Sequence, residues 1–311
     1  MREITKLQSA VDKAYQNFRH DNSGANADYI PFLAQIDSQL CALSIVTVQG
    51  DVITAGDTQY RFALESISKV CTLALALEDY DANTIQEKIG ATPTGLPFNS
   101  VMALELHGEK PLSPLVNAGA MSAASIIKAQ SIEERWQRIL AIQQKLGSKD
   151  IYLSDELNQS EQTTNFHNRG IAWLLYSAGY LYCDTMEACD VYTRQCSTLV
   201  TTVELATMGA TIASGGKNPI TQEQVLKPDN CTRILAEMTM EGMYDSSGDW
   251  AYTVGLPSKS GVGGGILTII PGVMAIAAFS PPLDTVGNSV RGQKMITSVA
   301  KELDYNLYKC I

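Results

Sequence analysis

The sequence has little of what a nucleic-acid-binding or disulfide-rich protein needs. There are 23 Lys and Arg residues against 33 Asp and Glu residues, which gives a formal net charge of −10 at pH 7. Because a phosphate backbone binds to a basic face, this charge argues against nucleic acid as a partner. The seven cysteines are an odd, scattered set without a CxxC pair, and the three histidines do not cluster with them. We therefore expect reduced thiols, and neither a zinc site nor a disulfide framework.

Long apolar runs are also absent. The longest, residues 266–279, is interrupted by Pro271-Gly272 and is too short to span a membrane. The first residues, 1–6, have no apolar core of the kind found in signal peptides. Hydrophobic residues make up 45% of the chain and charged residues 18%, which is typical of a globular protein. We therefore expect a soluble, cytoplasmic protein that has no membrane as a partner.

The strand signals lie at the two ends of the chain. Runs rich in β-branched and apolar residues predict five strands, at residues 43–48, 52–55, 60–64, 266–270 and 273–279. The first two are separated by Gly50-Asp51 and the last two by Pro271-Gly272, so each pair is expected to form a hairpin. The last two runs do not alternate between apolar and polar residues, which predicts central strands buried on both faces.

Helical signals begin and end the chain and fill its middle. Apolar residues recur at helical spacing over residues 3–19 and 287–303, and signals from about 80 to 250 are almost wholly helical. Ser131 with Glu134 predicts a capping box. Four local expectations concern shorter segments: a helix over 32–37, a polar linker over 192–197, a helix over 199–213 and a loop over 246–250.

This order predicts an α/β (α+β) fold in which residues 1–311 form one domain with two lobes. A sheet built from residues 43–64 and 250–280, covered by the terminal helices, would form a lobe from residues 1–65 and 250–311. Residues 66–249 would form a mainly helical insert, the second lobe. Small ligands usually bind in the cleft between two lobes.

Ser66 lies where a strand-like run meets an apolar helical run, residues 67–77. Ser66 and Lys69 are three residues apart, so on a helix they share one face. This helix is apolar on nearly every face except at Lys69, which predicts that it is buried and that the pKa of Lys69 is lowered towards neutrality. Lys69 can then take the proton of Ser66, while free N–H groups at the helix start bind an oxyanion. The pattern predicts an acyl-transfer serine hydrolase.

The Ser66-x-x-Lys69 motif is weak by itself, because the chain holds a second copy at Ser125 and Lys128. That copy lies inside a helix expected to begin near residue 116, so its serine has no free N–H groups nearby. A serine near a helix cap and a solvated lysine are the alternative interpretation of either copy.

Six motifs, in order, resemble those of the serine-dependent glutaminase family, whose fold is similar to that of the β-lactamases and transpeptidases. They are Ala27-Asp28-Tyr29-Ile30-Pro31, Glu65-Ser66-Ile67-Ser68-Lys69, Val116-Asn117-Ala118-Gly119-Ala120, Tyr192-Thr193-Arg194-Gln195-Cys196-Ser197, Gly242-Met243-Tyr244-Asp245-Ser246-Ser247-Gly248 and Lys259-Ser260-Gly261-Val262-Gly263-Gly264-Gly265. Together they span nearly the full length. The chain is similar to the compact bacterial members, without the extra terminal regions of the animal enzymes.

The resemblance implies hydrolysis of L-glutamine to L-glutamate and ammonia, without a metal or organic cofactor. By the same resemblance, Ser66 is the nucleophile, which forms a γ-glutamyl ester, and Lys69 is its base. Tyr29 and Tyr244 would line the catalytic centre, with Tyr244 as a proton relay. The backbone N–H groups of Ser66 and Val262 would form the oxyanion hole.

The resemblance also implies a set of substrate contacts: Ser66, Asn117, Glu161, Asn168, Tyr192, Tyr244 and Val262. Glu161 would accept the α-ammonium of glutamine, and Asn168 and Tyr192 would donate to its α-carboxylate. Lys259 would either tune the site electrostatically or anchor its strand. Assembly as a homodimer or homotetramer is expected by the same analogy.

Two other classes of function stay open. A penicillin-recognising hydrolase or peptidase could use the same fold, although such enzymes act outside the cytoplasm. A non-catalytic glutamine-binding or scaffold protein could have kept the fold, although the intact Ser66 and Lys69 pair disfavours it. For a glutaminase, the physiological role would be nitrogen supply or acid tolerance, because released ammonia takes up a proton near neutral pH.

Overall fold

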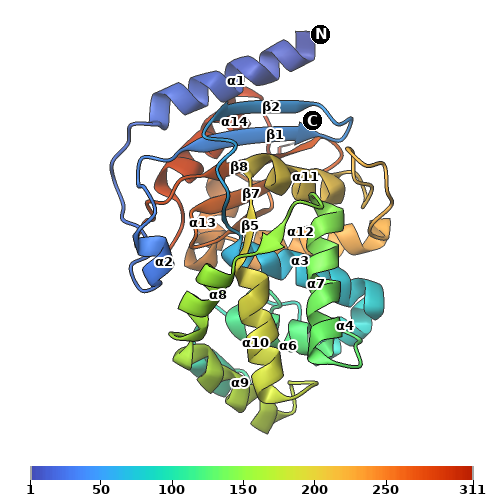
Figure 1. Ribbon diagram of the computed structural model, residues 1–311. Helices are drawn as coiled ribbons and strands as arrows, with labels where there is room; N and C mark the ends of the chain where they lie inside the picture. The colour runs from blue at the N-terminus through green and yellow to red at the C-terminus, as the bar shows by residue number, and fades with distance from the viewer. Residues whose placement is uncertain (1, 310–311) are drawn as a thin grey trace.

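The centre of the molecule is a five-stranded antiparallel sheet, seen in a computed structural model that describes residues 2–309 (Figure 1). Its strand order is β2-β1-β8-β7-β6. The strands are β1 (Ala42–Thr47), β2 (Val52–Gly56), β6 (Ser258–Ser260), β7 (Gly265–Ile270) and β8 (Met274–Phe279). β1, β7 and β8 are buried along their whole length, so the expected buried central hairpin is confirmed.

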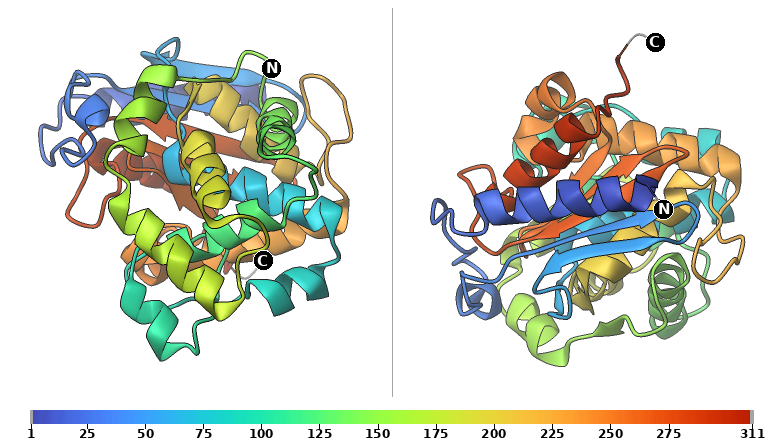
Figure 2. Two further views of the ribbon diagram at one scale, coloured as in Figure 1. Left: turned by 60° about the horizontal axis from the view of Figure 1, so that its bottom comes forward. Right: turned by 90° about the horizontal axis from the view of Figure 1, so that it is seen from above.

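Helices cover both faces of this sheet. The helices at the two ends of the chain, α1 (Arg2–Phe18) and α14 (Val290–Glu302), pack on one face, and α11 (Thr202–Ala213) packs on the other (Figures 1 and 2). The remaining helical elements are α2 (Pro31–Ala34), η1 (Glu65–Ile67), α3 (Ser68–Asp79), α4 (Ala82–Lys88), α5 (Val101–Leu106), α6 (Asn117–Ile126), α7 (Ile132–Leu146), α8 (Asp155–Gln162), α9 (Phe166–Ala178), α10 (Thr185–Cys196), α12 (Pro228–Glu241), η2 (Tyr244–Ser246) and α13 (Ser247–Thr253). The expected architecture, an antiparallel sheet with flanking terminal helices and a mainly helical insert, is confirmed. The exact lobe boundaries stay a prediction.

The expectation that residues 60–64 belong to the main sheet is wrong. Residues Phe62–Ala63 form β3, which pairs with β5 (Thr198–Val200). A further strand, β4 (Tyr152–Leu153), completes this separate three-stranded sheet. The Phe62 ring stacks on Phe279 of β8 with 4.3 Å between ring centroids, so aromatic packing joins the two sheets where strand pairing was expected.

Two segments expected to be coil are helical. Residues 192–196 form the last turns of α10, because that helix buries one face against α3 and α6 despite its polar sequence. Residues 246–250 belong to η2 and α13, where Trp250 is buried. Residue 199, expected to begin a helix, lies in β5, and α11 starts only at Thr202 behind a complete capping box.

Three further helix expectations are correct in part. The helix near 32–37 is shorter and spans Pro31–Ala34. The helical region after Ser154 is divided by residues 163–165 into α8 and α9. The capping box at Ser131 is half formed: Ser131 accepts from the N–H of Glu134, but the Glu134 carboxylate accepts from Gln130 instead.

The two Ser-x-x-Lys copies have different surroundings, as expected. Ser66 lies in η1, directly before α3, and the first ten residues of α3 are buried. Ser125 lies in the last turn of α6, where it accepts from the N–H of Tyr182. Lys128 lies beyond the end of α6 and is exposed, and its Nζ donates to the carbonyl of Asp79.

The cysteines that the structure describes are free thiols, and Cys310 lies outside the described residues. Within residues 2–309, no helix has both the length and the apolar character needed to cross a bilayer.

Phe279 tests the packing between the two sheets. Its buried ring stacks on Phe62 and also on Tyr60, at a centroid distance of 5.4 Å. We expect Phe279→Ala to lower the free energy of unfolding by about 3–5 kcal/mol, because it leaves a cavity there. Tyr252→Ala is the control: Tyr252 is 91% exposed, so its removal should change stability by no more than about 0.5 kcal/mol. Urea denaturation measures both, and equal midpoints for the two variants would contradict the packing.

Candidate active site

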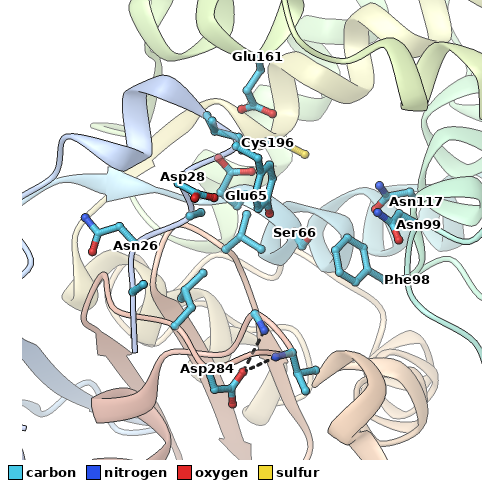
Figure 3. A pocket seen from close by; sticks show the side chains of 18 of the residues that line it. Asn26, Asp28, Glu65, Ser66, Phe98, Asn99, Asn117, Glu161, Cys196 and Asp284 are labelled. Atoms are coloured by element: carbon cyan, nitrogen blue, oxygen red, sulfur yellow. Dashed lines mark hydrogen bonds between the residues drawn. The ribbon is translucent and has the colours of Figure 1, made fainter. Parts of the chain in front are cut away.

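A cavity of about 940 Å³ opens above the Ser66 turn (Figure 3). Ser66 lies near its centre in Figure 3, with Phe98 and Asn117 on one side and Glu65 and Glu161 on the other. Seven of the ten residues singled out from the sequence line it: Tyr29, Ser66, Asn117, Glu161, Asn168, Tyr192 and Val262. The other three, Lys69, Tyr244 and Lys259, are buried beside it. The structure therefore brings all ten together from distant parts of the chain.

The Ser66 turn is held by a glycine-rich turn, residues 261–264, that follows β6. This turn is closed by hydrogen bonds from Gly264 N to Gly261 O and from Gly261 N to Gly265 O. It lies so close to the Ser66 segment that a Cβ at Gly261 would be 2.9 Å from the carbonyl oxygen of Leu64. Only glycine allows this approach. Val262, in the same turn, is thereby placed beside Ser66.

Lys69 is fully buried one helical turn after Ser66. Its Nζ donates to Asn117 Oδ1 at 2.7 Å and lies 5.7 Å and 5.9 Å from the ring centroids of Phe98 and Tyr192. Burial lowers the pKa of Lys69 to about 8, although the negative charges around it act to raise that pKa. A lysine amine with a pKa near 8 can accept a proton at moderate pH.

The amide of Asn168 is oriented by a chain of hydrogen bonds that starts at Lys69. Because Asn117 Oδ1 accepts from Lys69, its Nδ2 is free to donate, and it donates to Asn168 Oδ1 at 3.0 Å. The NH₂ group of Asn168 is then the part of that side chain left to donate to a ligand. Asn168 thus offers a neutral donor to the cavity.

Two carboxyl groups lie on the same side of the cavity. Glu161, in the last turn of α8, accepts from Ser197 Oγ at 3.0 Å and contacts the carboxyl group of Glu65. Burial raises the pKa of both groups, and the charge of Glu161 raises that of Glu65 further. Glu65 was not singled out from the sequence. The signal was available: an acidic residue stands between an apolar strand run and an apolar helix, where a side chain must be buried.

Tyr244 and Lys259 lie together behind the Ser66 turn. The buried Tyr244 ring packs on Phe98, with 4.6 Å between centroids, and Lys259 Nζ is 4.5 Å from the Tyr244 centroid. Burial raises the pKa of Tyr244 well above its usual value, and only the nearby Ser66 side chain acts notably against this. Lys259 Nζ donates to the carbonyls of Gly242 and Ser260, and burial, with the charge of Lys69, lowers its pKa.

The two remaining tyrosines are neutral phenols with different exposure. Tyr192, on α10, is buried, which raises its pKa well above the usual value. Tyr29, in the loop before α2, is 60% exposed at the mouth of the cavity. Partial burial of its hydroxyl, then the charges of Glu65 and Glu161, raise the pKa of Tyr29. Both can donate hydrogen bonds to a ligand.

Several lining residues were not singled out from the sequence. One side of the cavity is a loop shaped by Asp284, whose Oδ1 accepts from the N–H groups of residues 286–288 (Figure 3). Asp28, Phe98 and Asn99 also line the cavity. Only the folded chain brings these loops to one place. Among the residues that the structure describes, no group of three or more His, Cys, Asp or Glu side chains could hold a metal ion.

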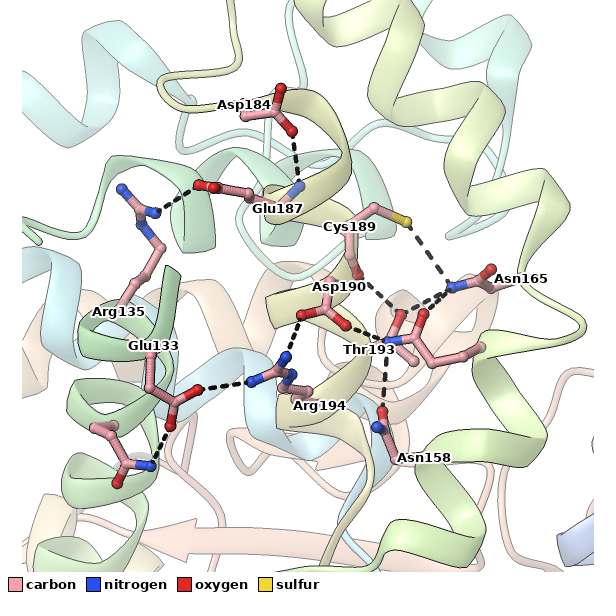
Figure 4. A network of polar contacts seen from close by, with 12 residues as sticks. Glu133, Arg135, Asn158, Asn165, Asp184, Glu187, Cys189, Asp190, Thr193 and Arg194 are labelled. Carbon is pink, nitrogen blue, oxygen red and sulfur yellow. Dashed lines mark hydrogen bonds and ion pairs between the residues drawn. The ribbon is translucent and has the colours of Figure 1, made fainter. Parts of the chain in front are cut away.

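A polar cluster ties the α8–α9 junction to α10 (Figure 4). Asn165 Nδ2 donates to Thr193 Oγ1 at 3.0 Å, and Gln162 Nε2 donates to Asp190 Oδ1 at 2.7 Å. Asp190 also pairs with Arg194, at 2.8 Å. The cluster therefore positions α8 and α9, which supply Glu161 and Asn168, against the helix that supplies Tyr192.

Comparison with known proteins agrees with the sequence motifs. The family model described as Glutaminase matches residues 24–308. A glutaminase of Desulfovibrio desulfuricans is 76% identical, over 99% of this chain and 100% of its own. A solved structure described as a probable glutaminase has a TM-score of 0.98 and 70% identity, over 98% of this chain and 99% of its own. A covalent complex of Bacillus subtilis glutaminase with 5-oxo-L-norleucine, formed from 6-diazo-5-oxo-L-norleucine, has a TM-score of 0.86 and 29% identity, over 98% of this chain and 100% of its own. The expected β-lactamase/transpeptidase-like fold class is confirmed.

Thr193 tests the cluster between α9 and α10. Its hydroxyl accepts from Asn165 and donates to the carbonyl of Cys189, and the residue is buried. Thr193→Val keeps the shape and removes the hydroxyl, so we expect the free energy of unfolding to fall by about 1–3 kcal/mol. Thr232→Val is the matched control, because Thr232 is exposed and its hydroxyl donates only within its own helix. Urea denaturation compares them, and an unchanged midpoint for Thr193→Val would show that the cluster contributes nothing.

Proposed function

This chain belongs to the glutaminase family, and from that premise we propose that it hydrolyses L-glutamine to L-glutamate and ammonia through a γ-glutamyl ester of Ser66. The observation that carries the proposal is the buried Lys69, whose pKa is lowered to about 8 one helical turn from Ser66, beside the cavity. A buried amine of this kind is a suitable base for a serine hydroxyl. The covalent complex of the Bacillus subtilis glutaminase supports an enzyme-bound intermediate in this chain too.

Substrate binding matches each charge of the zwitterion to a suitable partner. The α-ammonium of glutamine binds the Glu161 carboxylate. Its α-carboxylate accepts from the NH₂ group of Asn168 and the hydroxyl of Tyr192, which are neutral donors. Tyr29 closes the mouth of the cavity over the bound substrate. The side-chain amide then reaches Ser66, with Asn117 holding Lys69 in place.

Acylation begins when Lys69 Nζ takes the proton of Ser66 Oγ and the oxygen attacks the carboxamide carbon. The negative oxygen that forms accepts from the N–H groups of Ser66 and Val262, an interaction typically worth two to three orders of magnitude in rate, or about 3–4 kcal/mol. The carbon–nitrogen bond then breaks, and the nitrogen takes up the proton to leave as ammonia. The buried Tyr244 hydroxyl lies near Ser66 and bonds to no other described side chain, so it is suited to pass that proton.

Deacylation repeats these steps with water. Lys69 takes a proton from a water molecule, whose oxygen attacks the ester carbon. The ester bond breaks, Ser66 Oγ regains its proton, and L-glutamate is released.

Lys259 anchors β6 through two carbonyls, and its position against the Tyr244 ring keeps that phenol oriented.

A cytoplasmic location and assembly as a homodimer or homotetramer are further parts of this proposal. The location is the expectation drawn from the sequence composition, and the assembly follows from the analogy with the family. The single-domain organisation with two lobes is likewise proposed, and the site lies where the Ser66 turn and the helical insert meet.

Ser66 is the first residue to test. We expect Ser66→Ala to lower kcat by about four to six orders of magnitude, because no oxygen remains to form the ester. Ser125→Ala, in the second Ser-x-x-Lys copy, should keep kcat/KM within about twofold, because Ser125 lies outside the cavity. Coupled detection of glutamate, with glutamine and asparagine as substrates, measures both variants.

Two results would reject these assignments. Ammonia release that survives Ser66→Ala would remove Ser66 as the nucleophile. Turnover of nitrocefin by the wild-type enzyme without release of glutamate would instead favour a penicillin-recognising hydrolase.

Lys69 is tested by its rate and by its linkage to stability. Lys69→Met should lower kcat by about two to four orders of magnitude, because the base is lost. The folded-state pKa of Lys69, about 8, lies below its unfolded value. The folded protein therefore binds fewer protons, so wild-type stability should rise relative to Lys69→Met as pH increases from about 8 to 10. Urea midpoints of the two proteins over this pH range measure the difference. If both midpoints change with pH in the same way, burial does not neutralise Lys69.

A further inference from the structure

Glu65 brings a second carboxyl group into the cavity beside Glu161 (Figure 3). The Glu65 side chain is buried, with 4% of the residue exposed, whereas Glu161 is partly open to the cavity. Each carboxyl group acts on the pKa of the other, so the two side chains are close neighbours in the cavity wall. Neither forms a salt bridge with any side chain that the structure describes. Two carboxylates in contact without a paired cation do not both stay ionised, so the pair holds one proton.

The position of Glu65 is built into the fold. Its φ of +49° is unusual for a residue other than glycine, and such strain persists only where the surroundings enforce it. Two glycines make room for the side chain: a Cβ at Gly261 would lie 3.3 Å from Glu65 Cβ, and one at Gly263 would lie 3.2 Å from Glu65 Cγ. The carboxyl group is therefore held at one place in the cavity.

The hydrogen bonds assign the proton to Glu65. Ser197 Oγ lies 3.0 Å from Glu161 Oε1 and shares its one proton between that oxygen and the carbonyl of Thr193, and this contact acts to lower the pKa of Glu161. Glu65 Oε1 has no hydrogen-bond partner, and a buried carboxylate without donors is costly. Glu65 in its acid form avoids this cost and donates to Glu161.

The titratable surroundings of Glu65 favour the acid form. One facing group is a cation, Lys69 on α3, and its charge acts against the burial and the Glu161 charge that raise the pKa of Glu65. The other titratable groups around the pair are neutral or anionic: Asp28 and Tyr29 from the loop before α2, Tyr192 and Cys196 from α10, and Tyr244 from η2.

We propose that Glu65 is a positioning residue of the substrate site, a neutral acid that donates to Glu161 and leaves a single negative charge there for the α-ammonium of an amino acid. This inference rests on the proposed function. A zwitterionic substrate brings one ammonium and one carboxylate, so one negative charge in the pair balances the ammonium. A second would repel the substrate carboxylate. Loss of the Glu65 proton at higher pH therefore raises KM.

Glu65→Gln separates the hydrogen bond from the charge. The glutamine amide donates to Glu161 as the acid does, but it does not titrate. The measurement is the ratio of kcat/KM for wild type to kcat/KM for Glu65→Gln, with L-glutamine, from about pH 5 to pH 9. Titration of the substrate ammonium affects both enzymes and cancels in this ratio. We expect the ratio to be constant at low pH and to fall at least about tenfold at high pH, mainly through KM, because the second negative charge that wild type gains there repels the substrate carboxylate.

Glu65→Leu is the companion variant, and it also serves if Glu65→Gln does not fold. It removes the hydrogen-bond donor and the titrating group, so its KM should be raised at every pH, without the further rise in KM that wild type shows at high pH. An infrared difference spectrum of wild type minus Glu65→Gln should contain the carbonyl band of a protonated carboxylic acid. Glu237→Gln is the control, because Glu237 is a buried carboxyl outside the cavity. The carbonyl band of Glu237 should keep its intensity when L-glutamate binds, whereas the band of Glu65 should change.

Three results would overturn the inference. A ratio that does not change with pH would make Glu65 purely structural. The acid limb of the kcat/KM profile could instead have a lower pKa in Glu65→Gln than in wild type. That result would show that ionised Glu65 pairs with Lys69 in the working enzyme. Absence of the carboxylic acid band would show that the pair holds no proton on Glu65. Failure of the proposed function itself is distinct: wild type would then release no glutamate at any pH.

Discussion

The close approach of the glycine turn at residues 261–264 to the Ser66 segment is the constraint on which the site depends. Because Gly261 and Gly263 have no side chain, the turn after β6 lies directly against the backbone that precedes Ser66. This one contact joins the main sheet to the start of α3. It brings Val262 and Ser66 into the lining of the same cavity and leaves the space that Glu65 occupies. A larger residue at either glycine would separate these elements.

Around this contact the chain buries an unusual number of charged groups with few opposite charges. Lys69 and Lys259 are both fully buried, and neither forms a salt bridge with the side chains that the structure describes. Burial therefore lowers the pKa of both lysines and raises that of Glu65. Each group becomes more easily neutral than in water. A site that moves protons between an amine, a hydroxyl and a leaving nitrogen benefits from this, because no step must separate strongly hydrated charges.

The polar cluster on α10 shows why local patterns misled the interpretation of residues 192–197. Thr193 and Arg194 look like linker residues, since polar side chains in sequence favour coil. In the fold Thr193 binds Asn165 at the start of α9, and Arg194 binds Asp190 of its own helix and Glu133 of α7, so contacts within and between helices satisfy their polarity. The same holds for residues 60–64. Their composition predicts a strand, and residues 62–63 do form β3, but β3 pairs with β5 and only the Phe62 ring packs on Phe279 of the main sheet.

By itself the sequence determined the elements whose hydrophobic period is strong. These are the two terminal helices, the β1–β2 and β7–β8 hairpins and the buried helix after Ser66. The ordered motifs indicated the family, and the resemblance to that family named ten site residues, which the fold then gathered around one cavity. Tertiary structure alone decided which sheet β3 joins, the helical state of residues 192–196, and the pairing of Glu65 with Glu161. The physical reason is common to all three: each depends on contacts between segments far apart in the chain. A local sequence pattern indicates only which residues of a segment are buried, and not which other segment buries them.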